Sequence, residues 1–223
     1  MSKELPRRRF LKFLVGTSFL NSDTIDDFIS NLEINEYFSE FQNYVLPILT
    51  NNIDKISKIP NTGKLTDLNL LRTYYPVYRV GQDRFGIPWY LLWIIHERES
   101  TMSTNINAFN MSTGYKNAMQ RDPRTYTDEE AVSLANEYDY EYLKFLSLNH
   151  PSDYLEIPYA AKILRDHAIR IMGKGDADNW NEAVGLSLNN YCSQECADSR
   201  RQAFGSISDI LGQNQPQSSL NLL

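Results

Sequence analysis

The sequence predicts an all-α fold, and three observations lead to this expectation. Apolar residues recur at intervals of three and four along most of the chain, which is the period of a helix with one buried face. The alternation of apolar and polar residues that marks half-buried strands is scarce. Glycine and proline fall between the periodic stretches, where helices start or stop, at Gly81, Gly86, Pro123, Pro151, Gly173 and Gly175.

The composition indicates one globular domain and excludes one class of partner. A chain of 223 residues is long enough for a single core and a leader. Its 42% hydrophobic content, with 14 Tyr, 10 Phe and 3 Trp, is too rich in core-forming residues for a disordered chain. The net charge of −6 argues against nucleic acid, because phosphate binding needs clustered Lys and Arg.

Residues 1–22 resemble a twin-arginine export signal. The resemblance lies in the run Arg7-Arg8-Arg9-Phe10-Leu11-Lys12 and the short apolar stretch after it, although Pro6 stands where such signals have Ser or Thr. A short amphipathic helix of the mature protein is the alternative. The apolar stretch is too short for an ordinary membrane span, and no later segment qualifies as one. The expected location is therefore the cell envelope, periplasmic or extracellular, without an integral membrane span.

The chain divides into four expected parts. After the leader, residues 23–66 form an accessory segment, with one or two helices between Thr24 and Ile56 and then a linker marked by Pro60 and Gly63. Residues 67–211 form the main domain, and residues 212–223 form a frayed tail rich in Gln, Asn and Ser.

Six helical stretches are expected in the main domain, each read from apolar residues at helical spacing. The first carries a proline, Pro76, at which we expect the helix to break. The stretches are Leu68 to Tyr78, Pro88 to Glu99, Asp128 to Leu146, Ile157 to Met172, Trp180 to Tyr191 and Glu195 to Leu211.

Two cysteines, Cys192 and Cys196, lie four residues apart in a region expected to be helical. A disulfide would suit an exported protein, although this spacing fits a regular helix poorly, so bonded and free thiols both remain open. A metal site would need further ligands, and the three histidines His96, His150 and His167 stand at no supporting spacing. We expect no metal and no cofactor.

The strongest local signal is the segment from Phe85 to Ser100. Pro88 suits the first turn of a helix, because its missing N–H would have no partner there. The run from Trp89 to Ile95 is apolar on every side, which predicts a helix buried all round at the centre of the domain.

Glu99 is the candidate catalytic residue, because it continues the apolar face of Leu92 and Ile95 at intervals of three and four. Desolvation there favours the protonated carboxyl, which a general acid requires. Glu97 is a rival on another stripe of the same helix, and a helix-capping or ion-paired Glu99 is the structural alternative. The zinc-protease pattern His-Glu-x-x-His fails, because Ser100 stands where the second His belongs.

At this point the sequence resembles the lytic transglycosylases, relatives of goose-type lysozyme. Members carry Glu-Ser at the end of a buried helix, an apolar residue three positions after the Glu, and then Gly-Ala-x-Gly-Leu-Met-Gln. This chain has Glu99-Ser100 with Met102, and then Gly114-Tyr115-Lys116-Asn117-Ala118-Met119-Gln120. Asn replaces the second glycine, and Asn tolerates a left-handed backbone better than other non-glycine residues. The resemblance implies a lysozyme-like helical domain with Glu99 as acid and base, supported by Ser100, and with Met119 and Gln120 lining the sugar cleft.

A downstream Ala-x-x-Tyr-Asn element of the family faces the cleft. The corresponding region, Ala183 to Cys192, departs from it: either Asn189 keeps the family Asn, or Tyr191 supplies the phenol in a shifted register. Both are expected substrate-binding residues.

The resemblance also implies a reaction and a substrate. A lytic transglycosylase cleaves the β-1,4 bond between N-acetylmuramic acid and N-acetylglucosamine in peptidoglycan strands and leaves a 1,6-anhydromuramyl end. That capture is intramolecular and needs no second carboxylate, unlike the hydrolases that use two. Asp122 would supply a second carboxylate if the enzyme were a hydrolytic muramidase. A non-catalytic glycan-binding or scaffold protein is the alternative of another class, because a fold does not establish an activity.

Overall fold

The computed structural model describes residues 32–60, 65–103, 128–190 and 194–212, and all the regular elements in these ranges are helices. The predicted all-α class is therefore confirmed. Residues 32–40 are helical and continue into a π-helical turn, η1, while η3 and η4 are short 3-10 helices. The elements in chain order are η1 (Phe41–Val45), α3 (Leu46–Asn51), α4 (Ile53–Ile56), α5 (Leu68–Phe85), α6 (Trp89–Ser100), α7 (Asp128–Glu137), η3 (Glu141–Phe145), α8 (Asp153–Lys174), α9 (Trp180–Ser187), η4 (Leu188–Asn190) and α10 (Gln194–Gly212).

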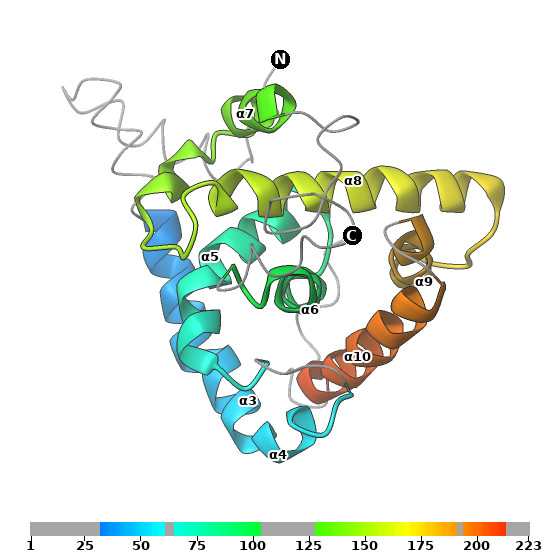
Figure 1. Ribbon diagram of the computed structural model, residues 1–223, viewed down its shortest axis with the longest axis horizontal. Helices are drawn as coiled ribbons and strands as arrows, with labels where there is room; N and C mark the ends of the chain where they lie inside the picture. The colour runs from blue at the N-terminus through cyan, green and yellow to red at the C-terminus, as the bar shows by residue number, and fades with distance from the viewer. Residues whose placement is uncertain (1–31, 61–64, 104–127, 191–193, 213–223) are drawn as a thin grey trace.

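Helix α6 is the central element of the fold. Figure 1 shows it end-on, with α8 running across one side, α5 and α3 along another, and α10 closing the third. It packs against α5, α8 and α10, and its residues from Leu91 to Glu97 are all buried. A helix with apolar side chains on every face buries all of them only when other elements surround it in the core. The predicted central helix is confirmed, and it begins directly after Pro88, which is its N-cap.

The predicted break at Pro76 is wrong, because α5 continues through it to Phe85. The residues around the proline, Tyr74, Tyr75, Val77 and Tyr78, are fully buried, and this packing outweighs the hydrogen bond that a proline removes. The helix ends at Gly86, whose φ of 70° is the left-handed conformation that glycine adopts without strain.

Gly81 also lies inside α5 and not at a helix boundary, which corrects the expectation from sequence. A Cβ atom placed on Gly81 would lie 2.5 Å from Leu92 Cδ1 of α6 and 3.3 Å from Ala161 Cβ of α8. Glycine stands here because three helices meet closely at this point, and not because the chain turns.

Other predicted boundaries shift. The stretch from Asp128 to Leu146 is not one helix: α7 ends at Glu137, Asp139 has a φ of 53°, and η3 follows. Helix α8 starts four residues earlier than expected, at Asp153, because its first turn is stabilised by a buried acidic side chain at the positive helix end. Regular α-helix in α9 ends at Ser187, before the 3-10 turn η4.

The N-terminal helical segment packs into the same core as the rest. Phe41, Leu49 and Ile56 are fully buried in the common hydrophobic cluster, and the rings of Phe41 and Tyr75 lie 5.2 Å apart. Each such side chain contributes about 1.5–3 kcal/mol of burial free energy. Among the described helices, none combines the length and the apolar character that crossing a bilayer requires.

Candidate functional site

Glu99 stands on the last turn of α6 and is buried, with 8% of its surface exposed. The intervals of three and four that link it to Leu92 and Ile95 place it on a face of α6 that packs against other helices. A carboxyl group in this position has lost most of its contact with water. The free-energy cost of burying its charge is offset either by a positively charged partner or by binding a proton, which removes the charge.

The partner is Arg200 of α10, whose Nη2 donates to Glu99 Oε1 in a buried ion pair. Arg98, one residue before Glu99, adds a second positive charge nearby. Burial raises the pKa of Glu99 above its ordinary value, whereas the attraction to Arg200 and Arg98 works in the opposite direction. The net direction is upward, so the site favours the protonated form more than water does.

Glu97, the rival carboxylate, is buried as well, with 6% of its surface exposed. It acts electrostatically on Tyr78 of α5, whereas Glu99 meets α10. The two glutamates therefore face different neighbours, and both remain candidates by burial alone.

Ser100 is fully buried, and its hydroxyl bonds the backbone around it. Its Oγ donates to the carbonyl of His96 at 3.2 Å and accepts from the N–H of Ser103 at 3.0 Å. In this arrangement Ser100 fastens the end of α6 to the following turn. These contacts are with the backbone near Glu99, and the expected support of Glu99 by Ser100 stays a prediction.

The turn after Ser100 has an uncommon conformation. Thr101, Met102 and Ser103 have φ values of 52°, 54° and 61°, all in the left-handed region that non-glycine residues rarely adopt. Each such residue costs roughly 1–2 kcal/mol, and strained backbone of this kind is concentrated at functional sites.

The other predicted site residues are only partly described. Asn189 lies exposed on η4, where its Oδ1 accepts from Arg201 Nη1 at 2.6 Å. Met119, Gln120, Tyr191 and the alternative carboxylate Asp122 lie outside the described residues. Their expected placement beside Glu99 stays a prediction.

Cys196 is disulfide-bonded, and the structure leaves no free cysteine among the described residues. The sequence holds one other cysteine, Cys192, which lies outside the described ranges. Of the two alternatives left open by the spacing, the bonded one is therefore supported. Within the described residues, His, Cys, Asp and Glu side chains form no group that would hold a metal ion.

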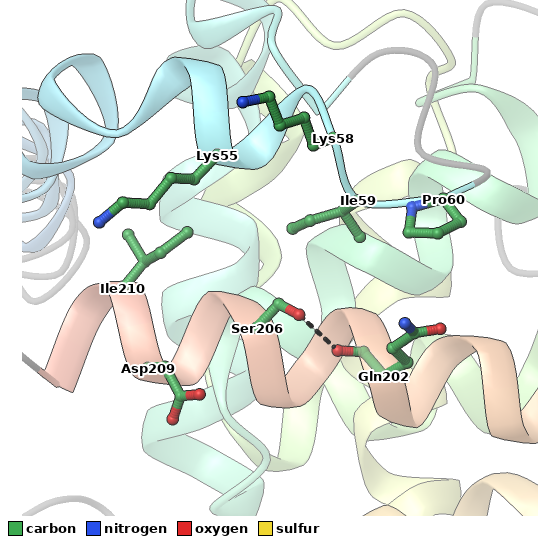
Figure 2. Close-up of a pocket in the computed structure, with 8 residues that line it drawn as sticks. All are labelled: Lys55, Lys58, Ile59, Pro60, Gln202, Ser206, Asp209 and Ile210. Carbon is green, nitrogen blue, oxygen red and sulfur yellow. Dashed lines mark hydrogen bonds between the residues drawn. The ribbon is translucent and has the colours of Figure 1, made fainter.

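Glu99 is absent from the lining of two cavities that are formed by described residues. Figure 2 shows the smaller one, of about 340 Å³, between the end of α4 and α10. It is lined by Lys55, Lys58, Ile59, Pro60, Gln202, Ser206, Asp209 and Ile210.

Arg98, which directly precedes Glu99 in the chain, links one residue of this cavity's lining, Pro60, to α10. Its Nη2 donates to the carbonyl of Pro60, and its Nη1 donates to Ser199 Oγ on α10, both at 2.8 Å. The larger cavity, of about 690 Å³, is lined by Trp89 and Tyr90 at the opposite end of α6. Ten residues of helix rise, or about 15 Å, separate it from Glu99.

Sequence reasoning missed Arg200, the residue that most directly controls Glu99. Its signal was present, because Arg200 stands on the buried stripe of α10 between Ala197 and Ala203, at intervals of three. An arginine on an apolar stripe indicates a buried partner of opposite charge.

Comparison with known proteins finds no matching family, no matching curated protein and no matching solved structure.

Proposed function

We infer that the chain is a lytic transglycosylase that cleaves the glycan strands of peptidoglycan, with Glu99 as general acid and then general base. The observation that carries this proposal is the burial of Glu99 at the end of the central helix, which raises the pKa of its carboxyl. A glutamate with a raised pKa remains protonated at a pH where an exposed one has lost its proton.

The reaction needs Glu99 first protonated and then ionised, and the surroundings of Glu99 contain one feature that stabilises each form. The protonated carboxyl donates to the glycosidic oxygen as the bond from muramyl C1 to that oxygen breaks. The muramyl C6 hydroxyl then attacks C1 and closes the 1,6-anhydro ring, while Glu99 takes the hydroxyl proton and returns to its starting form. Desolvation favours the acid form, and the adjacent Arg200 guanidinium stabilises the carboxylate between the two steps.

The test is cleavage of purified peptidoglycan by the wild type, Glu99→Gln and Glu97→Gln. Glu97→Gln is a matched control, because it makes the same change in an equally buried glutamate two residues away. We expect Glu99→Gln to lose about 10²- to 10⁴-fold in rate, which is the usual contribution of a general acid, and Glu97→Gln to retain activity. The reverse result would transfer the role to Glu97, and equal rates for the wild type and Glu99→Gln would overturn the proposal.

Mass spectrometry of the products separates the alternatives within this class. Anhydro ends are about 18 Da lighter than reducing ends, since the reaction adds no water. Reducing ends would identify a hydrolytic muramidase of the same fold. Glycan binding without cleavage would identify a non-catalytic binding protein.

A further inference from the structure

A buried network of polar side chains connects α5, α6 with the turn that follows it, and the start of α8. Its central atom is Ser103 Oγ, which lies 2.9 Å from Asp153 Oδ1 and 2.7 Å from His96 Nε2. The other oxygen of Asp153 accepts from the hydroxyl of Tyr74, and the other nitrogen of His96 lies 2.9 Å from the hydroxyl of Tyr78. The mechanism above uses none of these five residues.

The direction of each hydrogen bond follows from the number of protons available. Ser103 has one hydroxyl proton, which it donates to Asp153, so His96 Nε2 must donate to Ser103 Oγ. His96 Nδ1 then accepts from Tyr78. This assignment requires a neutral imidazole, and complete burial lowers the pKa of His96 to about 3, which keeps it neutral.

Ser103 is also the end of the left-handed turn that follows α6. The N–H groups of the turn donate back into the helix: Thr101 to the carbonyl of Glu97 at 2.7 Å, and Met102 to that of His96 at 3.2 Å. The carbonyl of Met102 accepts from Asn149 Nδ2 at 2.8 Å. Three consecutive side-chain-bearing residues hold positive φ here because the turn is bonded at both ends.

The turn is also bonded to the last residue of α6. The N–H of Ser103 donates to the hydroxyl of Ser100, which follows Glu99 directly in the chain. If the Asp153 bond to Ser103 is lost while residue 103 still carries a Cβ atom, a contact that holds its φ of 61° is lost, and the strain of the left-handed region favours a change in the turn. The last turn of α6, which carries Glu99, would then lose one of the contacts that hold its C-terminal end.

We propose that Ser103 and Asp153 are positioning residues for Glu99, because their hydrogen bond holds the left-handed turn that sets the direction of the Glu99 carboxyl. This inference rests on the proposed function for its effect on catalysis. Its structural part, that Ser103 controls the surroundings of Glu99, stands independently of any activity.

The test compares two substitutions that remove the same hydroxyl with opposite effects on the backbone. Ser103→Ala loses the bond and disfavours the φ of 61°, whereas Ser103→Gly loses the bond but adopts positive φ readily. We expect Ser103→Ala to lower kcat about 10- to 100-fold with KM nearly unchanged, since a misplacement of about 1 Å has that effect. Ser103→Gly should remain within about fivefold of wild type, because glycine adopts the φ of 61° without strain and so no longer needs the bond to Asp153.

Thermal unfolding of the same variants separates positioning from stability. Both should unfold at lower temperature than wild type, because each leaves His96 and Asp153 without the serine hydroxyl. Tyr37→Phe is a control, because it removes the hydroxyl of another buried residue, one that donates to Asp83 of α5 at 2.9 Å and has no part in the proposed site, and it should lower stability without lowering kcat.

A carbon-13 signal from the Glu99 carboxyl, assigned by its loss in Glu99→Gln, gives a readout that needs no activity. It should shift and titrate differently in Ser103→Ala and return toward the wild-type position in Ser103→Gly. Equal kcat losses in the two variants would overturn the catalytic part, and an unchanged signal in Ser103→Ala would overturn the structural part. If the wild type cleaves no glycan, the proposed function fails, and the carboxyl signal still decides whether Ser103 positions Glu99.

Discussion

Removing the positive partner of Glu99 should destabilise the protein in a manner that depends on pH. In Arg200→Met the apolar stem is replaced by a side chain of similar length, while the guanidinium that bonds Glu99 is lost. The two side chains are only 5% and 11% exposed, so solvent screens the pair little. Breaking such a pair costs about 3–5 kcal/mol if the remaining charge stays ionised.

The carboxyl escapes part of this cost by binding a proton, and that limits the effect. At pH 7 the electrostatic loss cannot exceed about 1.4 kcal/mol for each pH unit between the wild-type pKa of Glu99 and 7. Because that pKa is raised above 4.5, the limit is below about 3.4 kcal/mol at pH 7 and below about 0.7 kcal/mol at pH 5. We therefore expect the destabilisation to be larger at pH 7 than at pH 5, by no more than about 2.7 kcal/mol.

The sign follows from proton binding. A carboxyl with a raised folded pKa holds its proton more tightly in the folded state, so its contribution is most favourable below its ordinary value of 4.5 and is lost as pH rises through the folded pKa. Arg200→Met raises the folded pKa of Glu99 further and extends that loss to higher pH.

Thermal unfolding followed by circular dichroism at pH 5 and pH 7 measures this difference. For a chain of this size, each 1 kcal/mol of this difference corresponds to a melting-temperature change of about 2–4 °C. Arg201→Met is the matched control, because Arg201 is a neighbouring, more exposed arginine whose partner Asp198 lies at the surface. The reasoning is refuted if Arg200→Met loses the same stability at both pH values, or if adding Glu99→Gln to it restores nothing at pH 7.

Two further outcomes follow from the same structure. The rate of peptidoglycan cleavage should fall as pH rises through the pKa of Glu99, because the first step needs its proton; a rate that is flat between pH 5 and pH 8 would contradict the assignment. Gly81→Ala should lower the free energy of unfolding by about 1–3 kcal/mol, because its Cβ would overlap Leu92 at the contact between α5 and α6. Chemical denaturation measures that loss. An unchanged midpoint would show that Leu92 and its neighbours move to accept the added Cβ atom without a loss in the free energy of unfolding.

Periodicity was enough to predict the central helix and the burial of its carboxylate. The run from Trp89 to Ile95 is apolar on every side, which predicts a buried helix. The burial of Glu99 is then predicted from its spacing of four and seven residues from Ile95 and Leu92. The rule that proline and glycine mark helix ends gave wrong predictions in α5. Pro76 and Gly81 lie inside this helix because of tertiary packing, which a local sequence pattern does not show.

The electrostatic partners of the candidate site were beyond local reasoning for a similar reason. Arg200 is 101 residues from Glu99, and Asp153 is 50 residues from Ser103. Pairs at such separations become neighbours only when helices pack, and a single sequence offers no measure of that packing. The expected cleft residues Met119 and Gln120 stay predictions.

The N-terminal helical segment behaves as a fixed wall of the domain. The hydroxyl of Tyr37 donates to Asp83 at 2.9 Å, and Glu40 forms an ion pair with Arg79 at 3.3 Å. These two polar contacts with α5 add to the apolar packing around Phe41. Detaching this wall would uncover aromatic rings of α5 to water, which makes it unsuited to swing as a hinged arm. The segment is therefore a rigid part of the domain. The predicted boundary near residue 66 separates two stretches of sequence whose side chains share one hydrophobic core.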